Sequence, residues 1–231
     1  MASNPQQDKG VPVSNDQASR TLGAVFFPNF ELLDIFGPLE MFGSVGPEVR
    51  IATIAEQAGP VRSTQGPAVS ADHSFDDCPK LDLLIVPGGI GTMTEGANPR
   101  MLEFLRARVA EAELVMSVCS GSGLLGKAGL LDGIRATTNK QFFTLVASEG
   151  PKVDWVREAR WVDSGKFVTS SGVAAGTDMA LAVIARLWGE ERAEKIAALT
   201  EFTWHRDADT DPFTRYLDQG DVGEASAALE A

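Results

Sequence analysis

Short apolar runs of strand length alternate along this chain with segments of helical character. Residues 81–86 read LDLLIV and residues 114–118 read LVMSV. Neither run alternates regularly between apolar and polar residues, as a strand with one solvent-exposed face does. Strands that are apolar throughout are typical of parallel sheets, because helices cover both faces of such sheets. The chain is therefore predicted to be an α/β protein with a mostly parallel sheet between two layers of helices.

The expected elements follow one another over most of the sequence. Strands are expected at 21–27, 49–55, 81–86, 114–118 and 135–138, and helices at 32–42, 99–112, 121–128, 141–148, 174–187 and 190–202. A small hairpin or excursion is expected at 61–75, and a hairpin of strands 155–162 and 166–169 around the turn Asp163-Ser164-Gly165. We expect a disordered polar tail at 1–20, a single domain at 21–217 and an acidic, alanine-rich tail at 218–231.

Composition removes several classes of function. The chain has 231 residues and a formal net charge of −12, which argues against nucleic acid or an anionic membrane as its main partner. No apolar run approaches the length of a membrane span, and the first residues lack the apolar core of a secretory signal. We therefore expect a cytoplasmic protein with free thiols.

Cysteine and histidine are too few for the common metal sites. The two cysteines exclude a disulfide scaffold and any four-cysteine zinc module. His73 and His205 lie far apart and lack the spacing of helical zinc ligands. Neither a metal nor an organic cofactor is expected.

Three segments follow expected strands or stand at the start of helices: 29–37, 87–91 and 119–123. In open α/β sheets, sites form beyond the carboxyl ends of the strands. The functional residues are expected where these segments converge.

Cys119 joins a strand directly to a helix, in the order strand, Cys, Ser, Gly, Ser, Gly. This is the layout of a nucleophile elbow with cysteine in place of serine. The helix N-terminus favours a thiolate, so we expect the pKa of Cys119 to lie below its ordinary value. The alternative is an inert buried cysteine. Cys78 stands among carboxylates in FDDCP, which indicates a structural or idle thiol.

Four motifs resemble the DJ-1/PfpI superfamily, and most closely its isonitrile hydratase-like branch and the amidase-like domain of AraC-type regulators. They are LLDIFGPLEMF at 32–42, LDLLIVPGGIGT at 81–92, SVCSGSGLLGKAGLLDGIRATTN at 117–139 and SSGVAAGTDMAL at 170–181. The resemblance implies a flavodoxin-like, class I glutamine-amidotransferase-like sandwich, a homodimer, and no cofactor.

The resemblance also implies roles for individual residues. Asp34 of D-x-x-G-P would approach Cys119 as acid and base, although an aspartate here could instead cap the helix. Backbone N–H groups of Gly89 and Ser120 would polarise the substrate or orient water. Gly172 and Val173 would lie beside the site. Asp178, which follows them, is expected to be an ordinary first-turn helix charge.

The chain departs from its relatives at three places. Ser120 follows the cysteine and Asn139 stands after A-T-T, positions where relatives often carry histidine. His205 is expected to be a partly exposed tail residue. The segment 201–213, EFTWHRDADTDPF, is a degraded form of one that lines or covers the pocket in hydratase relatives.

The leading functional hypothesis is hydration of an isocyanide, a small molecule, to an N-substituted formamide through a Cys119 thioimidate. One alternative is a DJ-1-like glyoxalase or another hydrolase of small electrophiles. A second is a non-catalytic ligand- or redox-sensing protein. The regulator branch reads DNA through a basic helix-turn-helix region that this acidic sequence lacks, so DNA binding is not expected.

Overall fold

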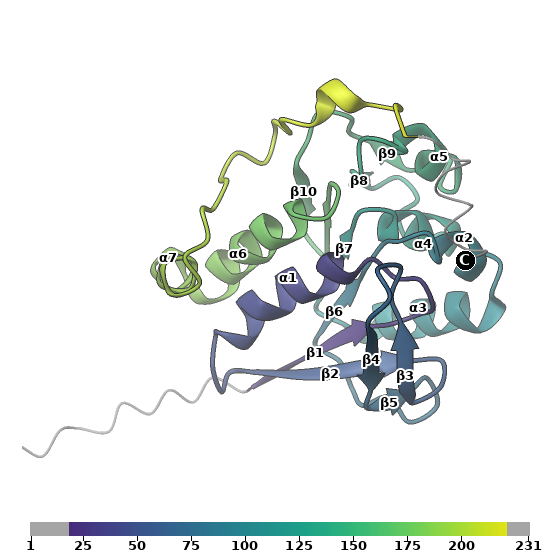
Figure 1. Cartoon of the computed structure of the whole chain (residues 1–231), viewed down its shortest axis with the longest axis horizontal. Helices are drawn as coiled ribbons and strands as arrows, with labels where there is room; N and C mark the ends of the chain where they lie inside the picture. Colours follow the sequence, from purple (N-terminus) through teal and green to yellow (C-terminus); the bar gives the residue numbers. More distant parts are fainter. Residues whose placement is uncertain (1–18, 221–231) are drawn as a thin grey trace, which may run out of the picture.

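A computed structural model describes residues 19–220, in which strands and helices alternate (Figure 1). The strands are β1 Arg20–Val25, β2 Val49–Ala55, β3 Gly59–Arg62, β4 Ala68–Ala71, β5 His73–Ser74, β6 Leu83–Val86, β7 Leu114–Val118, β8 Arg135–Ala136, β9 Asp154–Trp155, β10 Trp161–Ser164 and β11 Phe167–Ser170. The helices are α1 Leu32–Gly43, α2 Thr92–Glu95, α3 Pro99–Glu111, α4 Gly121–Lys127, α5 Phe143–Ser148, α6 Ala175–Trp188, α7 Glu190–Leu199 and the 3-10 helix η1 Thr214–Tyr216.

A seven-stranded sheet in the order β10-β11-β7-β6-β1-β2-β5 forms the centre of the molecule. Neighbouring strands are parallel except for β10, which is antiparallel to β11. The carboxyl ends of β1, β6 and β7 therefore meet at one edge of the sheet, as the apolar runs predict. The expected α/β fold is confirmed.

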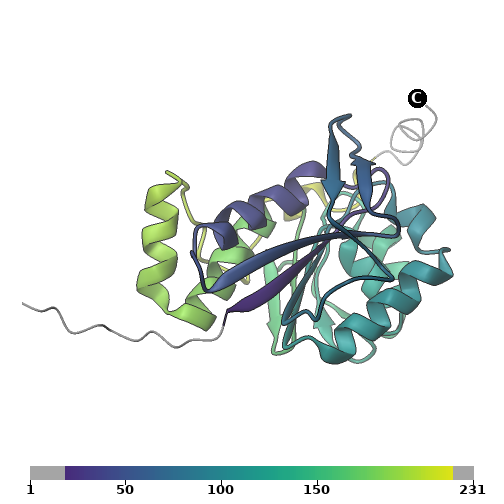
Figure 2. The same ribbon diagram turned by 90° about the horizontal axis from the view of Figure 1, so that it is seen from below.

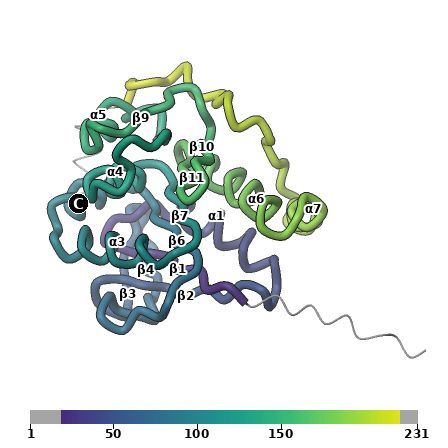
Figure 3. The backbone as a smooth tube through the Cα atoms, turned by 180° about the vertical axis from the view of Figure 1, so that it is seen from behind, coloured from purple at the N-terminus to yellow at the C-terminus, as the bar shows by residue number. Residues whose placement is uncertain are grey.

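The central strands are buried on both faces. Every residue of β6, β7 and β11 is buried, which is why these strands lack polar alternation. Helices α1 and α6 pack together on one face with α7 beside them, and α3 and α4 lie on the other (Figures 1 and 3). The core of the molecule lies between the sheet and these two layers.

The hairpin or excursion expected at 61–75 is present, whereas the strand expected at 155–162 is shorter than predicted. Residues 61–75 form the hairpin β3–β4, which projects from the body (Figure 2), and β5, which joins the main sheet. The strand expected at 155–162 begins only at Trp161. Just before it, the Glu158 carbonyl accepts from Asp211 N and the Arg160 N–H donates to the Ala208 carbonyl, while the Arg160 carbonyl accepts from Ser171 N at 2.7 Å, next to β11.

Residues 200–220, here called the C-terminal segment, run from α7 across the molecule to α5 (Figure 1, yellow). The backbone N–H of His205 donates to Asp178 at 2.8 Å, and that of Asp211 donates to the Glu158 carbonyl at 2.7 Å. The segment is thus fixed to the body although it has almost no regular structure.

The boundaries expected for the two tails shift slightly. Arg20, assigned to the first tail, begins β1. Asp218, assigned to the second, accepts hydrogen bonds from the backbone and hydroxyl of Thr144, both at 2.7 Å. The rest of both expected tails, 1–18 and 221–231, lies outside the described residues. Between residues 19 and 220, no helix combines the length and apolarity needed to cross a bilayer.

Candidate active site

Cys119 occupies a strained turn between β7 and α4. Its φ is +55°, in the left-handed region that a residue with a side chain rarely adopts. Hydrogen bonds to neighbouring residues fix this turn. The Cys119 N–H donates to the Ser171 carbonyl at 3.1 Å, and the Cys119 carbonyl accepts from Thr138 Oγ1 at 2.8 Å and from Ser122 Oγ at 3.0 Å. Strain held in place by its surroundings is typical of functional positions, so the elbow expected from the sequence is present.

Gly88, just after β6, lets its turn approach the elbow. A Cβ at this position would lie 2.6 Å from Ser120 N and 2.8 Å from Cys119 Cβ, closer than atoms of two side chains pack. Only glycine fits. The small residues of PGG therefore place a backbone N–H beside the cysteine.

Asp34 lies behind Cys119 and is fully buried. The N–H of Gly88 donates to its Oδ2 at 2.8 Å. Its Oδ1 has no hydrogen bond of normal geometry and faces the Cys119 thiol and the N–H of Val173. Asp34 does not cap α1, since Glu31 holds the N-cap position. The sequence-based pairing of Asp34 with Cys119 is seen in the structure.

Burial dominates the electrostatics of this pair. It raises the pKa of the Asp34 carboxyl well above its ordinary value, with the Gly88 N–H opposing and the charge of Glu31 adding to the rise. Burial, and then the charge of Asp34, likewise raises the pKa of the Cys119 thiol, and the Ser120 N–H opposes this only in part. The expectation of a lowered Cys119 pKa is therefore wrong, because desolvation and a like charge outweigh the helix N-terminus.

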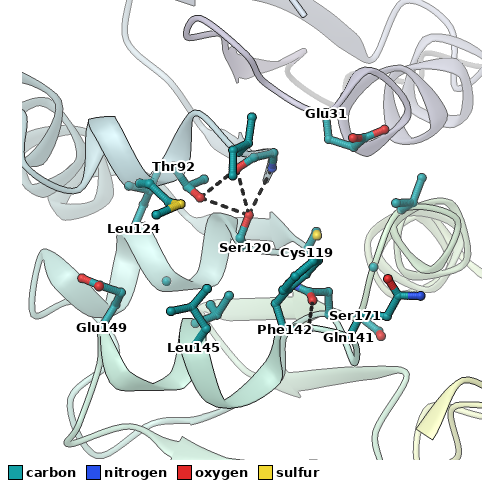
Figure 4. A pocket seen from close by; sticks show the side chains of 18 of the residues that line it. Glu31, Thr92, Cys119, Ser120, Leu124, Gln141, Phe142, Leu145, Glu149 and Ser171 are labelled. Atoms are coloured by element: carbon teal, nitrogen blue, oxygen red, sulfur yellow. Dashed lines mark hydrogen bonds between the residues drawn. The ribbon is translucent and has the colours of Figure 1, made fainter. Parts of the chain in front are cut away.

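Ser120 is the centre of a small hydrogen-bond network (Figure 4). Its Oγ accepts from Gly89 N at 3.1 Å and from Thr92 Oγ1 at 3.2 Å. The Gly89 N–H, expected to act on the substrate, is thus directed at Ser120. Any effect of Gly89 on a ligand passes through the Ser120 hydroxyl, which stands at the wall of the cavity.

A cavity of about 750 Å³ opens in front of Cys119. Cys119, Ser120, Gly89, Gly172 and Val173, all expected site residues, line it. Asp34 is reached only through Cys119. The lining residues missed by the sequence reasoning are mainly apolar, come from α2, α4, α5 and the C-terminal segment, and include Met93, Leu124, Phe142, Leu145, Val146 and Tyr216. Their apolarity resembled that of ordinary core positions.

Neither histidine lines this cavity. His73 belongs to β5, on the far edge of the sheet. His205 is partly exposed, as expected; its backbone N–H donates to Asp178, and its Nε2 atom is buried. Asn139 does line the cavity, and its Oδ1 accepts from Phe142 N at 2.9 Å. The site therefore contains a cysteine–carboxylate pair rather than a cysteine–histidine pair.

The buried ionic cluster, formed by Lys140, Arg160, Asp178 and Asp211, lies beneath the C-terminal segment. Arg160 donates to Asp178 Oδ2 at 2.8 and 2.6 Å and lies 3.7 Å from Asp211. Lys140 Nζ lies 4.0 Å from Asp211 and donates to the Ala159 carbonyl at 2.6 Å. Burial lowers the pKa of Lys140 to about 8. Asp178 is in the first turn of α6, as expected, but it is buried and paired.

Residues that could share a metal ion do not cluster. Among residues 19–220, no three His, Cys, Asp or Glu side chains are grouped closely enough to hold one.

Comparison with known proteins reveals clear relatives. The sequence profile of the DJ-1/PfpI family matches residues 23–186. An isonitrile hydratase of Pseudomonas putida is 36% identical over 183 residues, 78% of each chain. A solved ThiJ/PfpI family protein from Pseudomonas syringae has 31% identity and a TM-score of 0.74, covering 97% of this chain and 89% of that one. The transcriptional regulator GbdR of Pseudomonas aeruginosa is 29% identical over 82% of this chain, which spans about half of the regulator (52%).

Proposed function

Because this chain belongs to the DJ-1/PfpI family, we propose that it is an isonitrile hydratase, a cysteine-dependent hydro-lyase. One observation carries the proposal: the fully buried Asp34 carboxyl faces the Cys119 thiol at the end of a large cavity that no histidine lines. Peptide hydrolysis needs a base and an acid for the leaving amine, usually histidine. Hydration of R–N≡C has no leaving amine and needs only a nucleophile and one group that passes protons.

The first step is addition. Both pKa values are raised, so the pair holds a shared proton, and transfer of the thiol proton to Asp34 gives a Cys119 thiolate beside a protonated Asp34. The sulfur adds to the terminal carbon of the isocyanide while that carbon takes the Asp34 proton. The product is a thioimidate, R–N=CH–S–Cys119, beside an ionised Asp34.

The second step is hydrolysis. Asp34 takes a proton from water as the water oxygen attacks the thioimidate carbon, and that proton passes to the substrate nitrogen. The hydroxyl proton then returns to Asp34 as the C–S bond breaks. This releases R–NH–CHO and restores the Cys119 thiolate. The Ser120 hydroxyl, fixed by Gly89 and Thr92, is suited to orient the water. No step uses a metal or an organic cofactor.

The partners in this proposal are few. The substrate is a small-molecule isocyanide. A homodimer and a cytoplasmic location are part of the proposal and rest on the family and on the free thiols Cys78 and Cys119. Neither DNA nor a membrane is a proposed partner.

Turnover of p-nitrophenyl isocyanide, set against turnover of methylglyoxal, tests the proposal. We expect formamide product from the isocyanide and none after Cys119→Ser, because an alcohol without a base supplies almost no nucleophilic anion. Activity should survive dialysis against EDTA. Turnover of methylglyoxal alone would favour the glyoxalase alternative, and turnover of neither would favour the sensing alternative.

A further inference from the structure

Exposed large apolar side chains gather at the mouth of the Cys119 cavity. Between residues 19 and 220, seven such side chains are at least 38% exposed, and four of them line this cavity: Met93, Leu145, Phe213 and Tyr216. They come from α2, α5 and the C-terminal segment. Single exposed apolar residues are ordinary, but a group of them around a pocket indicates a binding surface.

Phe213 and Tyr216 form the most distinctive part of this surface. They are 51% and 39% exposed, and their rings stack with centroids 6.2 Å apart. The backbone on either side is fixed: Asp211 N donates to the Glu158 carbonyl at 2.7 Å, and Asp218 N to the Lys140 carbonyl at 2.9 Å. The rings are therefore solvent-exposed, but the backbone that carries them is fixed. This pre-organisation lowers the entropy cost of binding an apolar group.

Most of the charged side chains that line the cavity have partners within the protein. Lys127 and Glu149 form an ion pair of 2.7 Å on its wall. Lys140 Nζ donates to Thr137 Oγ1 and to the Ala159 carbonyl. The negative charge of Glu31, which also lines the cavity and accepts from Gln65 Nε2 at 2.7 Å, lies across the pocket from Leu124 and Leu145 and so away from the apolar wall.

The size of the cavity exceeds what an isocyanide group needs. Pockets of roughly 300–1,000 Å³ bury most of a drug-sized ligand, and this one measures about 750 Å³. Figure 4 places Leu124 and Leu145 across the pocket from Glu31, so apolar wall extends away from the polar end. The reacting group fills the Cys119 end, and the rest of the substrate must fill the remainder.

We propose that the substrate carries a large uncharged apolar body, of terpenoid or multi-ring aryl size, which packs against Phe213 and Tyr216 while its electrophilic carbon meets Cys119. The identity of the reacting group rests on the proposed function; the size and polarity of the body do not. Phe213 and Tyr216 are then specificity-determining residues rather than catalytic ones.

Alkylation of Cys119 tests this without assuming hydration. The probes are N-ethylmaleimide and N-(1-pyrenyl)maleimide, and the rate of each is measured on the Cys119 peptide by mass spectrometry. The ratio of the two rates cancels the thiolate fraction. Relative to free cysteine, we expect the wild type to favour the pyrenyl reagent at least ~10-fold, and Phe213→Ala with Tyr216→Ala to lower the ratio about 10-fold.

Two further variants keep the test decisive. Leu145→Ala, on α5, should also lower the ratio and does not depend on the C-terminal segment. Leu199→Ala is the control, because Leu199 is 73% exposed and does not line the cavity. A wild-type ratio at or below that of free cysteine, as when a second copy covers the mouth, would overturn the inference. So would a ratio unchanged in both cavity variants.

A parallel series of isocyanides separates this inference from the proposed function. We expect kcat/KM for adamantyl isocyanide to exceed that for ethyl isocyanide and to fall in the Phe213 and Tyr216 double variant. Turnover that is independent of substrate size would overturn the inference and leave hydration standing. No turnover, with the maleimide preference intact, would overturn hydration and leave the apolar subsite standing.

Discussion

Two groups of buried ionisable side chains each contribute one residue to the cavity wall, and they differ in how their charges are balanced. The buried ionic cluster has two cations, Lys140 and Arg160, and two carboxylates, Asp178 and Asp211. The Cys119–Asp34 pair has two acids facing each other, with Glu31 adding further negative charge. Opposite charges stabilise a fixed structure, whereas two acids compete for a proton. The first arrangement suits anchoring and the second suits proton transfer.

Asp34→Asn tests the proposed role of the acid pair and should cause the largest loss of activity. The amide keeps the size of the carboxyl but can neither give nor take the proton, so isocyanide turnover should fall ~10²–10⁴-fold. Steady-state formation of the formamide measures this. Wild-type-like turnover would remove Asp34 from the mechanism.

The same variant reports on the Cys119 pKa. In the wild type, burial and Asp34 raise this pKa, so the pH midpoint of iodoacetamide alkylation should lie above the ordinary value of ~8.5. Removing the neighbouring charge should move that midpoint down. A midpoint that does not move would mean that Asp34 and Cys119 do not interact electrostatically.

Arg160→Met tests the balanced cluster. It leaves Asp178 and Asp211 buried without their shared cation, which should lower the free energy of unfolding by about 3–5 kcal/mol. Urea unfolding followed by tryptophan fluorescence measures the loss. Adding Asp178→Asn should restore part of it, because one uncompensated charge is gone. A loss below about 1 kcal/mol would contradict the cluster's role as an anchor.

Lys140 gives the cluster a pH dependence of known sign. Its pKa is about 8 in the folded protein and ~10.4 when unfolded, so the unfolded chain binds the extra proton between these values. Its contribution to stability therefore rises as pH rises from about 8 to ~10.4, by on the order of 3 kcal/mol. The difference in unfolding free energy between the wild type and Lys140→Met should follow this rise. A flat difference would place the ammonium in solvent.

An exposed ion pair provides the smallest effect and the baseline. Lys195 and Glu191, one turn apart on α7, are 70% and 81% exposed. Glu191→Gln should leave the urea midpoint of unfolding almost unchanged, because exposed ion pairs contribute little to stability. A larger loss, measured in the same urea titration, would show that burial is not what distinguishes the cluster.

The central strands and the elbow were predictable because their signals are local. The runs LDLLIV and LVMSV are apolar almost throughout, and this predicts directly that β6 and β7 are buried on both faces. The pairing of Asp34 with Cys119 followed from the family resemblance, since 85 residues separate them in a chain whose topology brings the two strand ends together.

The buried cluster was not predictable in this way. Lys140 reads as an ordinary polar residue after A-T-T-N, yet its hydrogen-bond acceptors come from residues 137, 138 and 159, and its ion-pair partner is Asp211. Arg160 sits in a run that reads as a strand, WVREARWV, yet only the end of this run forms β10, and the Arg160 N–H donates to Ala208 of the C-terminal segment. The raised pKa of Cys119 was missed because the sequence reveals the helix that follows but not the depth of burial.

The position of the C-terminal segment in the chain has a consequence for synthesis. Residues 200–220 follow every strand of the sheet in the sequence, so they leave the ribosome last among these elements. The sheet, the elbow and the cations Lys140 and Arg160 can therefore be in place before Asp211 arrives to pair with them. Until then the cavity lacks the wall formed by Phe213 and Tyr216. In a nascent chain, the Cys119 elbow would therefore form before the aromatic wall to which we assign substrate specificity.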